Sequence, residues 1–496
     1  MHDDFIRIEN LFPHVTDWAD SSDKGYKWSE NLWVSQKDGW IALYRPLNLG
    51  LVYFKQDFFE ELINGVHTIT KDRLTKLIDE GILIPANDDR DRREHENLIS
   101  KARSGVFRFI CILPTTSCDL NCLYCHQRPD AGQERYMTTE EADAGLDKCA
   151  EVCSDKSKPV DILIYGGEPL QAFPVCQRIF ARACGDKPIF SQPVRLSFTT
   201  SGIGLTEEQV AVLVRYDVFV IISIDGMPEV NDRVRRSGDG RSSFRHASEA
   251  YNLLKKEGVR VGLSVTIGKH NIDTLSEQVE FLLNNFEPND IGLNAFLHRR
   301  GEGINPFQVN SRSAFDQFID AFEITRERGV YAEQPFRRLK PFVFRQPLLK
   351  DCSSPGERLV LAPGGLMGFC DSCYPDGVDF YTVEEFPGRD QEEYLKWASL
   401  SSVEMPQCRS CPAMSVCGGA CRYDALKASG RYDGVEPERC SFEKTFLNWT
   451  IWELFALRKS RLSDPYFPQD EERRALFGNV MMHEQNQPFT AGSYSE

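Results

Sequence analysis

The sequence has no excess of positive charge. Its 58 Lys and Arg residues are outnumbered by 74 Asp and Glu residues, which gives a formal net charge of −16. A surface this acidic repels nucleic acids and anionic membranes, so we expect neither a nucleic-acid partner nor a membrane partner.

Long apolar runs are missing too. No stretch reaches the roughly 18 consecutive apolar residues that a membrane-spanning helix requires. The first residues, MHDDFIRIEN, are acidic where a secretory signal would be basic. We therefore expect a cytoplasmic protein.

Cysteine, by contrast, is plentiful, with 16 residues. A reducing cytosol keeps thiols free, and a chain of 496 residues, long enough for two to four domains, needs no disulfides to stabilise its core. Metal ligation is therefore the leading explanation for the cysteines. The composition is otherwise that of globular protein, with 41% hydrophobic and 27% charged residues.

Residues 1–104 predict a small domain that begins with strands and continues with helices. The segment 40–54, WIALYRPLNLGLVYF, is typical of a β-hairpin broken at RPLN, and QDFFEELIN after it is of helix length. Thr70 is placed to cap a helix over KDRLTKLIDEG, and the ILI run that follows predicts a wing strand. We expect a winged-helix-like domain, followed by a solvated connector in the charged run 87–98.

The pattern changes to alternating strands and helices over residues 105–330. Six short apolar runs alternate with amphipathic segments of helix length: FRFICIL, VDILIYG, VRLSFTT, VFVIISIDG, VRVGLSVTI and DIGLNAF. This pattern predicts an α/β fold with a largely parallel sheet, a partial (β/α)6 barrel, whose ligands lie at the carboxyl ends of the strands. Residues 331–445 are looser and rich in Gly, Pro and Cys, and 446–496 predict a C-terminal helix and a disordered tail ending in NQPFTAGSYSE.

Three cysteines follow the first of these strands in the segment CDLNCLYCHQ: Cys118, Cys122 and Cys125. Structural zinc normally takes four ligands, and no second cysteine pair follows nearby. Three thiolates on one loop fit a cubane iron–sulfur cluster whose fourth iron is left open. A zinc loop and purely structural cysteines are the alternatives.

This C-x3-C-x2-C spacing, with Tyr124 before the last cysteine, resembles the signature of the radical S-adenosylmethionine (SAM) superfamily. In that family the open iron binds SAM, and one electron cleaves SAM to methionine and a 5'-deoxyadenosyl radical. The resemblance implies SAM as cofactor and a [4Fe–4S] cluster on the three cysteines.

The ends of the next three strands extend the resemblance over about residues 106–330. YGGEP resembles the motif that holds the SAM amine, TTSG departs at Ser201 from the usual TNG, and SIDG resembles the peptide-modifying branch. In isolation, YGGEP would be explained as a glycine turn with a surface Glu. Arg235, which follows SIDG, would be explained by a surface salt bridge. The resemblance implies SAM contacts at Tyr124, Gly166, Gly167, Glu168, Pro169, Thr200, Ser201, Ser223, Asp225 and Arg235.

Seven more cysteines form a second pattern: Cys352, Cys370, Cys408, Cys411, Cys417, Cys421 and Cys440. Two zinc sites could use such spacing, but it also matches the SPASM domain of radical SAM enzymes, with two auxiliary [4Fe–4S] clusters and thus three clusters in all. The resemblance implies a first auxiliary cluster on Cys352, Cys370 and Cys421 and a second on the other four. Either Cys373 completes the first cluster or substrate occupies its open iron. The remaining cysteines are expected to be buried thiols.

This layout resembles that of maturases of ribosomally made peptides, whose PqqD-like N-terminal element binds a precursor leader as an added strand. It implies a precursor-peptide partner, an electron donor such as flavodoxin or ferredoxin, and a net two-electron oxidation that forms a C–C cyclophane or a thioether. A structural cap is the alternative for the N-terminal domain. Formylglycine formation of the anaerobic sulfatase type, peptide epimerisation and a non-catalytic electron carrier remain alternatives for the chain. The base that accepts the released proton is not assigned; Asp225 is one of the acids expected near the barrel mouth.

Overall fold

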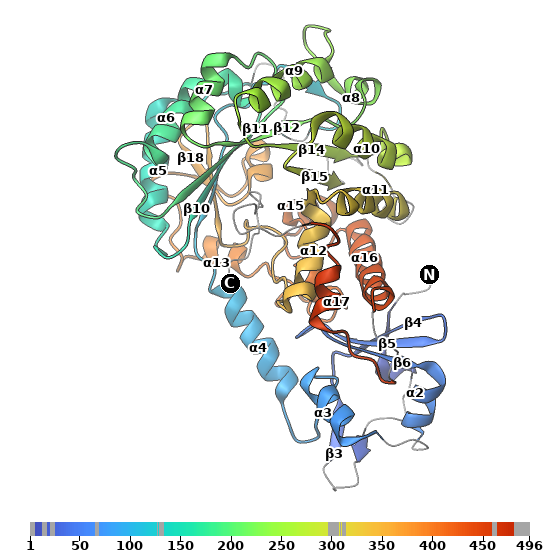
Figure 1. The fold of residues 1–496 in the computed structure, drawn as a ribbon. Helices are drawn as coiled ribbons and strands as arrows, with labels where there is room; N and C mark the ends of the chain where they lie inside the picture. The colour runs from blue at the N-terminus through green and yellow to red at the C-terminus, as the bar shows by residue number, and fades with distance from the viewer. Residues whose placement is uncertain are drawn as a thin grey trace.

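The computed structural model describes residues 5–11, 17–19, 25–64, 69–125, 127, 133–295, 307, 309, 314–458 and 464–480. The tail NQPFTAGSYSE, expected to be disordered, lies outside these residues. Figure 1 shows a large sheet flanked by helices at one end of the molecule and small N-terminal sheets at the other. Within the part of the chain that is described, every helix is too short or too polar to cross a membrane.

The N-terminal region contains two small sheets. The first is antiparallel, in the order β1-β4-β5-β6: Ile6–Arg7, Trp33–Lys37, Trp40–Arg45 and Gly50–Lys55. The second joins β2 (Asp17–Ala19), β3 (Gly25–Trp28) and β7 (Leu83–Pro85). The predicted hairpin is confirmed as β5 and β6, which pair from Trp40 with Lys55 to Arg45 with Gly50. The two predicted helices are α2 (Gln56–Ile63) and α3 (Lys71–Asp79), and both pack on a separate apolar core.

The charged run 87–98, predicted to be a solvated connector, leads into and begins helix α4 (Arg90–Arg103). This helix connects the N-terminal sheets to the large sheet, and most residues of the run are at least partly exposed. Arg90 and Glu94 form an ion pair one helical turn apart at 2.6 Å, which supports a helix rather than a loop. Asp91 is buried and pairs with Arg45, whose side chain is completely buried in the hairpin. The charged residues of this run thus neutralise a buried cation.

The six predicted strands all form, and they are parallel to one another. In sheet order they are β15 (Asp290–Ala295), β14 (Val261–Ile267), β12 (Phe219–Ser223), β11 (Val194–Thr200), β10 (Val160–Ile164) and β8 (Phe109–Ile112). Helices between them cover the sheet: α5 (Thr139–Val152), α6 (Phe173–Cys184), α7 (Glu207–Arg215), α9 (Ser243–Lys256), α10 (Leu275–Phe286) and α11 (Phe315–Glu327). The parallel α/β architecture predicted from the sequence is confirmed.

The sheet continues with strands from beyond residue 330. β16 (Tyr331–Ala332) adds to β15, while β17 (Arg358–Ala362) pairs with β8 in parallel and leads to antiparallel β18 (Leu366–Gly368) and β19 (Phe380–Thr382). Because β17 lies beside β8, the chain around Cys352 and Cys370 is brought next to the loop that follows β8. The short elements after it are η3 (Asp371–Asp376), α13 (Glu392–Ala398), α14 (Met414–Cys417) and α15 (Arg422–Ser429).

Long helices near the C-terminus join the two ends of the molecule (Figure 1). The predicted C-terminal helix is confirmed as α16 (Pro437–Ala456), which lies near α12 (Glu333–Phe344). The hydroxyl of Tyr53 on β6 donates to the carbonyl of Ile451 on α16 at 2.6 Å. Tyr466 then bridges to Tyr53 through two backbone hydrogen bonds, just before α17 (Asp470–Ala475). The N-terminal sheet is therefore packed on the body of the protein.

Candidate functional site

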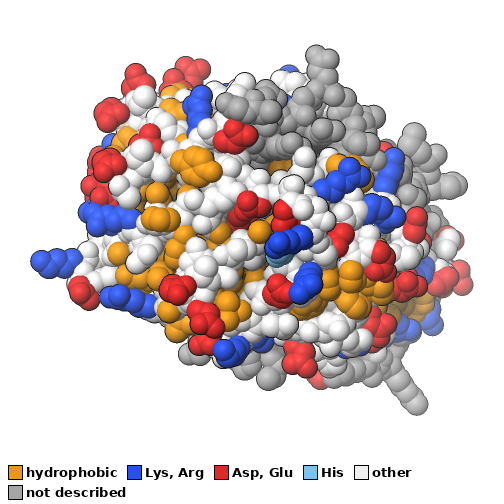
Figure 2. Space-filling model, turned by 90° about the horizontal axis from the view of Figure 1, so that it is seen from above, with side chains coloured by type: hydrophobic (Ala, Val, Ile, Leu, Met, Phe, Trp, Pro, Cys, Tyr) orange, Lys and Arg blue, Asp and Glu red, His pale blue; other side chains and the backbone are white. Residues whose placement is uncertain are grey.

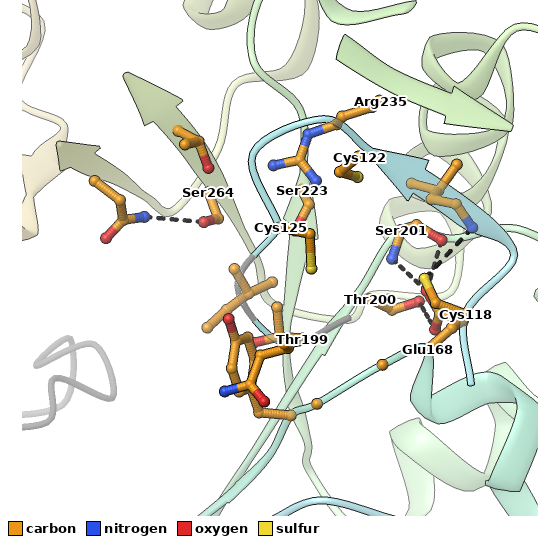
Figure 3. Close-up of a pocket in the computed structure, with 18 of the residues that line it drawn as sticks. Cys118, Cys122, Cys125, Glu168, Thr199, Thr200, Ser201, Ser223, Arg235 and Ser264 are labelled. Carbon is orange, nitrogen blue, oxygen red and sulfur yellow. Dashed lines mark hydrogen bonds between the residues drawn. The ribbon is translucent and has the colours of Figure 1, made fainter. Parts of the chain in front are cut away.

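The three cysteines of the first motif lie on a loop after β8 that a short sheet holds in place. Strand β9 (Leu120–Cys122) pairs antiparallel with β13 (Arg235–Ser237), so that Cys122 is opposite Arg235. All three cysteines line one cavity of about 610 Å³, and Figure 3 shows their side chains around it. Burial first, and then the Glu168 carboxylate, raise the pKa of the Cys118 thiol. Metal binding would release the thiol protons.

The cavity brings together most of the predicted contact residues. Those that line it are Tyr124, Gly166, Gly167, Glu168, Thr200, Ser201, Ser223 and Arg235. Pro169 and Asp225 lie outside the lining that the structure describes: Pro169 begins the short helix η1 (Pro169–Ala172), and Asp225 is completely buried behind Tyr124. The strand ends predicted from four separate motifs therefore meet in one place.

The two glycines after β10 let this turn pass against the cysteine loop. A Cβ at Gly167 would lie 2.2 Å from the carbonyl oxygen of Ser117, and Gly166 has a left-handed φ of 127°. The N–H groups of Gly167 and Glu168 donate to the carbonyls of Thr115 and Ser117 at 3.0 and 2.7 Å. The glycines were expected to admit a ligand; in the structure they also make room for the loop that carries Cys118.

Glu168 is the centre of a polar group at one end of the cavity (Figure 3). Its carboxylate accepts hydrogen bonds from the hydroxyls of Thr200 and Ser201, both at 2.6 Å, and from the N–H of Ser201 at 2.8 Å. Burial raises the pKa of Glu168, although these hydrogen bonds partly offset the effect. An acceptor that is already oriented in this way is suited to a cationic ammonium group.

Asp225 organises the opposite wall. It accepts a hydrogen bond from the hydroxyl of Tyr124 and pairs with Arg235 at 2.9 Å. Burial alone would raise the pKa of Asp225, but Arg235 and His270 outweigh it and lower the pKa to about 2. His270, which stacks on Tyr124 with ring centroids 5.7 Å apart, lies 3.5 Å from the carboxylate. Asp225 therefore fixes Tyr124 and Arg235, which do face the cavity.

The cavity reaches down to the starts of strands β12 and β15, where it meets a second polar group. Asp290, Gly292 and Asn294 line it from β15, and Glu333 lines it from α12. A Cβ at Gly262 would lie 2.0 Å from Asp290 Oδ1, so this glycine makes room for the carboxyl group. Burial and then Glu333 raise the pKa of Asp290 to about 8. At neutral pH this carboxyl group is largely protonated.

The C-terminal region supplies the remaining wall. Arg358 of β17 and Asp371 of η3 line the cavity and pair at 2.7 Å. The side-chain amide of Gln127, two residues after Cys125, donates to the carbonyl of Asp371 at 3.2 Å. The loop of the first cysteine motif thus touches the segment that carries Cys370.

Several lining residues were missed from the sequence. Asp290, Gly292 and Asn294 alternate along the run DIGLNAF, and this period of two puts them on one face of a strand. The run predicts a strand, and its alternation also indicates that these three residues share one face. Glu333 gave no signal, because its place depends on how α12 packs. Asp371 directly follows Cys370, but nothing in its sequence context indicates that it faces a cavity.

Thiols of the second set of cysteines interact electrostatically with one another. Among other neighbours, Cys370 and Cys352 influence the pKa of Cys421, and Cys408 and Cys440 influence that of Cys417. Within the described residues, no three His, Cys, Asp or Glu side chains gather as ligands of a single metal ion. The thiols are therefore not arranged in advance around one ion.

Figure 2 shows the molecule from above, with acidic, basic and apolar side chains interspersed over the visible face. The acidic side chains on this face are therefore mixed with basic ones rather than gathered in one block.

An open parallel sheet with three loop thiols and a glycine–carboxylate turn at its carboxyl edge defines a radical SAM fold. Residues 112–282 match the model of the Radical SAM superfamily, so the chain carries a radical SAM domain and the resemblance drawn from the cysteine motif is confirmed. The chain is 22% identical to the radical SAM cyclopropyl synthase TigE of Paramaledivibacter caminithermalis over 82% of this chain and 89% of that protein. It is 23% identical to the PqqA peptide cyclase of Ruegeria pomeroyi over 65% and 84%.

Solved structures share the fold. The chain is similar to native anSMEcpe with bound AdoMet, at a TM-score of 0.59 and 16% identity, over 70% of this chain and 98% of that one. It is also similar to Streptococcus suis SuiB bound to S-adenosylmethionine, at a TM-score of 0.52 and 14% identity, over 83% and 99%.

Proposed function

We propose that this protein is a radical SAM maturase that oxidises a ribosomally made precursor peptide and closes a crosslink within it, either a C–C cyclophane or a thioether. The observation that carries the proposal is the single cavity in which Cys118, Cys122 and Cys125 meet the Glu168 group on one side and Arg358 and Asp371 of the second cysteine region on the other. A relative named as a peptide cyclase supports a peptide substrate, and one named as a cyclopropyl synthase supports ring closure.

The residues of the cavity fit the cofactors that the family implies. The thiols of Cys118, Cys122 and Cys125 would hold a [4Fe–4S] cluster through three ligands and leave one iron open. SAM bound there would supply a 5'-deoxyadenosyl radical for hydrogen abstraction. Glu168 would accept the ammonium group of SAM, while Ser223 and Arg235 are placed to meet its ribose or carboxylate.

The chain itself positions the substrate and handles the proton. With a peptide bound, the walls would exclude water from the cavity and would hold one C–H bond near the radical source. When the substrate radical closes a bond, one proton and one electron must leave. Asp290 and Glu333 are carboxyl groups of the far wall that could exchange this proton, and the auxiliary clusters would accept the electron.

The second cysteine region would hold two auxiliary [4Fe–4S] clusters, as in the SPASM pattern. Cys408, Cys411, Cys417 and Cys440 would hold one cluster, and Cys352, Cys370 and Cys421 would contribute to the other. This region lies next to the cavity, because Gln127 contacts Asp371 beside Cys370, and it would provide the exit for the electron. An external flavodoxin or ferredoxin would exchange electrons with the clusters.

The N-terminal domain, residues 1–104, would bind the leader of the precursor. Its small sheets offer strand edges to which an extended peptide could add through main-chain hydrogen bonds. The edge of β6 is partly covered by Tyr466, so the three-stranded sheet β2-β3-β7 is the better candidate for leader binding.

The test is co-expression with a short open reading frame next to the gene, followed by mass spectrometry of the peptide. A crosslink should remove two hydrogens per modification, and replacement of Cys118, Cys122 and Cys125 by Ala should abolish both this change and 5'-deoxyadenosine formation. Cys184→Ala, which removes a partly exposed thiol of α6 outside both motifs, is the matched control. An unmodified peptide with active 5'-deoxyadenosine formation would reject the peptide substrate.

Formylglycine formation is the second candidate, because anSMEcpe with bound AdoMet and the Cp18Cys peptide shares the fold at a TM-score of 0.58. This reaction would leave an aldehyde that a hydrazide probe captures, whereas a crosslink leaves none. Epimerisation would leave the mass of the peptide unchanged in ordinary water. The mass spectrum therefore separates epimerisation from the other two reactions, and the hydrazide probe separates those two from each other.

A further inference from the structure

The second cysteine region contains one thiol more than the SPASM spacing uses. This thiol belongs to Cys373, which lies in η3 three residues after Cys370. Its side chain is only 1% exposed, and its sulfur lies 3.4 Å from the hydroxyl of Tyr432. A buried thiol beside other cysteines needs an explanation.

Cys370 and Cys373 form the same kind of backbone turn as the two other C-x2-C pairs of the chain. In each pair the N–H of the second cysteine donates to the carbonyl of the first: Cys125 to Cys122 at 3.2 Å, Cys411 to Cys408 at 2.9 Å, and Cys373 to Cys370 at 3.1 Å. C-x2-C is the spacing with which proteins chelate zinc and iron–sulfur clusters. The first two pairs belong to the motifs proposed above to hold clusters. The third pair therefore has the local geometry of a ligand pair.

Cys370 connects Cys373 to the other thiols of the first auxiliary set. The side chains of Cys370 and Cys373 share a hydrogen bond. Cys370 also interacts electrostatically with the thiols of Cys352 and Cys421. Through Cys370, Cys373 therefore joins the group of thiols to which Cys352 and Cys421 belong.

This group is separated from the central cavity. Among the described residues that line the cavity, the C-terminal region contributes Arg358, Asp371 and Ser372 but none of the four cysteines. Arg358 and Asp371 form an ion pair at 2.7 Å in the intervening wall. A peptide in the cavity would have to displace this pair to reach an iron held by the thiol group.

We infer that Cys373 is the fourth ligand of the auxiliary cluster that Cys352, Cys370 and Cys421 would hold. The cluster is then closed by protein thiolates, so the peptide does not bind its iron and the cluster only exchanges electrons. This inference rests on the proposed function. It means that Cys373, and not the substrate, takes the fourth ligand position of the first auxiliary cluster. The hydroxyl of Tyr432 is placed to donate a hydrogen bond to the Cys373 thiolate.

The test uses the full chain with Cys118, Cys122 and Cys125 replaced by Ala, so that only auxiliary clusters contribute to the spectra. After anaerobic reconstitution this parent should hold about eight irons, four in each cluster. Adding Cys373→Ala should leave one iron without a protein ligand. On mild oxidation that iron should be lost, which gives about seven irons and the electron paramagnetic resonance signal of a three-iron cluster.

Two controls separate ligation from packing. Cys184→Ala removes a thiol outside both sets, and Tyr432→Phe removes only the hydroxyl that faces Cys373; both should retain the full iron content without the three-iron signal. A measurement that needs no change at position 373 is titration of the reduced parent with cyanide, which binds open irons. The spectrum of the parent should not change, whereas that of the Cys373→Ala variant should.

The possible failures are distinct. Full iron content and an unchanged spectrum in Cys373→Ala, or a cyanide-induced shift in the parent, would overturn the ligand and leave the proposed function intact. About four irons in the parent would overturn the two-cluster assignment itself, and the ligand with it.

Discussion

At the scale of single residues, the site depends most on Asp225, a buried carboxylate that does not face the cavity. It neutralises Arg235, whose side chain is also buried, and it fixes the hydroxyl of Tyr124. Its pKa, lowered to about 2, means that this ionised carboxylate stabilises the fold at neutral pH. That contribution is lost only as the pH falls from the ordinary value of about 4 towards 2.

Asp225→Asn should therefore destabilise the protein at neutral pH. The amide keeps the shape but leaves Arg235 without a counter-charge, which should lower the free energy of unfolding by about 3–5 kcal/mol. Urea unfolding of the cluster-free chain measures this change, and Asp239→Asn, at an exposed carboxylate, is the control. Adding Arg235→Met should restore part of the loss; a loss under about 1 kcal/mol would show that the pair is not strongly coupled.

The pKa of Asp290 is raised rather than lowered, so Asp290 makes stability depend on pH in the opposite sense. Its pKa of about 8 exceeds that of an unfolded Asp, so the native state holds a proton that the unfolded chain has lost. Stability should fall as the pH rises through the window from about 4 to about 8. Glu333 is the charge that opposes its ionisation.

Asp290→Asn should remove this pH dependence, because an amide resembles the protonated carboxyl group and does not titrate. We expect the melting temperature of the unmodified protein to fall by several degrees more than that of the variant between about pH 5 and about pH 8. Differential scanning fluorimetry over this range measures the difference. Parallel curves would mean that Asp290 is ionised throughout.

At the scale of elements, the turn after β10 and the cysteine loop act as one unit. The N–H groups of Gly167 and Glu168 bond to the loop, and Gly167 lies too close to Ser117 for any larger residue. Strand β13 holds the other side of the loop at Cys122. The position of the three thiols thus depends on two neighbouring elements.

Gly167→Ala should displace the cysteine loop. The new Cβ would lie 2.2 Å from the carbonyl oxygen of Ser117, and backbone cannot rotate away as a side chain can. We expect a loss of about 1–3 kcal/mol in stability and at least a tenfold loss of 5'-deoxyadenosine formation. Gly238→Ala, which lies in the same cavity but has its nearest contact at 3.4 Å, should retain activity. Equal activity in both variants would refute the role of the turn.

At the scale of the whole molecule, the sequence predicted the sheet well because each strand is a short apolar run between turn residues. The cysteine motif and the turn at Glu168 were predicted because their chemistry depends on local spacing. The α4 helix was missed because its charged residues are explained by Arg45, a partner far along the chain. Glu333 and Arg358 were missed for the same reason: only the packing of α12 and the pairing of β17 with β8 bring them to the cavity.

The whole molecule also determines how function can be tested. The N-terminal sheet contacts α16 through Tyr53 and Trp452, whose indole N–H donates to the hydroxyl of Ser35 at 2.9 Å. Deletion of residues 1–104 would expose this interface and disturb the body of the protein. The contribution of the N-terminal domain is therefore better measured as leader-peptide affinity of the full chain.

The central claim is that a radical formed in this cavity takes a hydrogen atom from a peptide. The most direct measurement is mass spectrometry of the 5'-deoxyadenosine released when the reconstituted enzyme acts on its precursor with deuterium in the side chains of the core peptide. Deuterium should appear in 5'-deoxyadenosine at the same rate as the peptide loses it. Formation of 5'-deoxyadenosine without deuterium, at a rate unaffected by the peptide, would contradict the account.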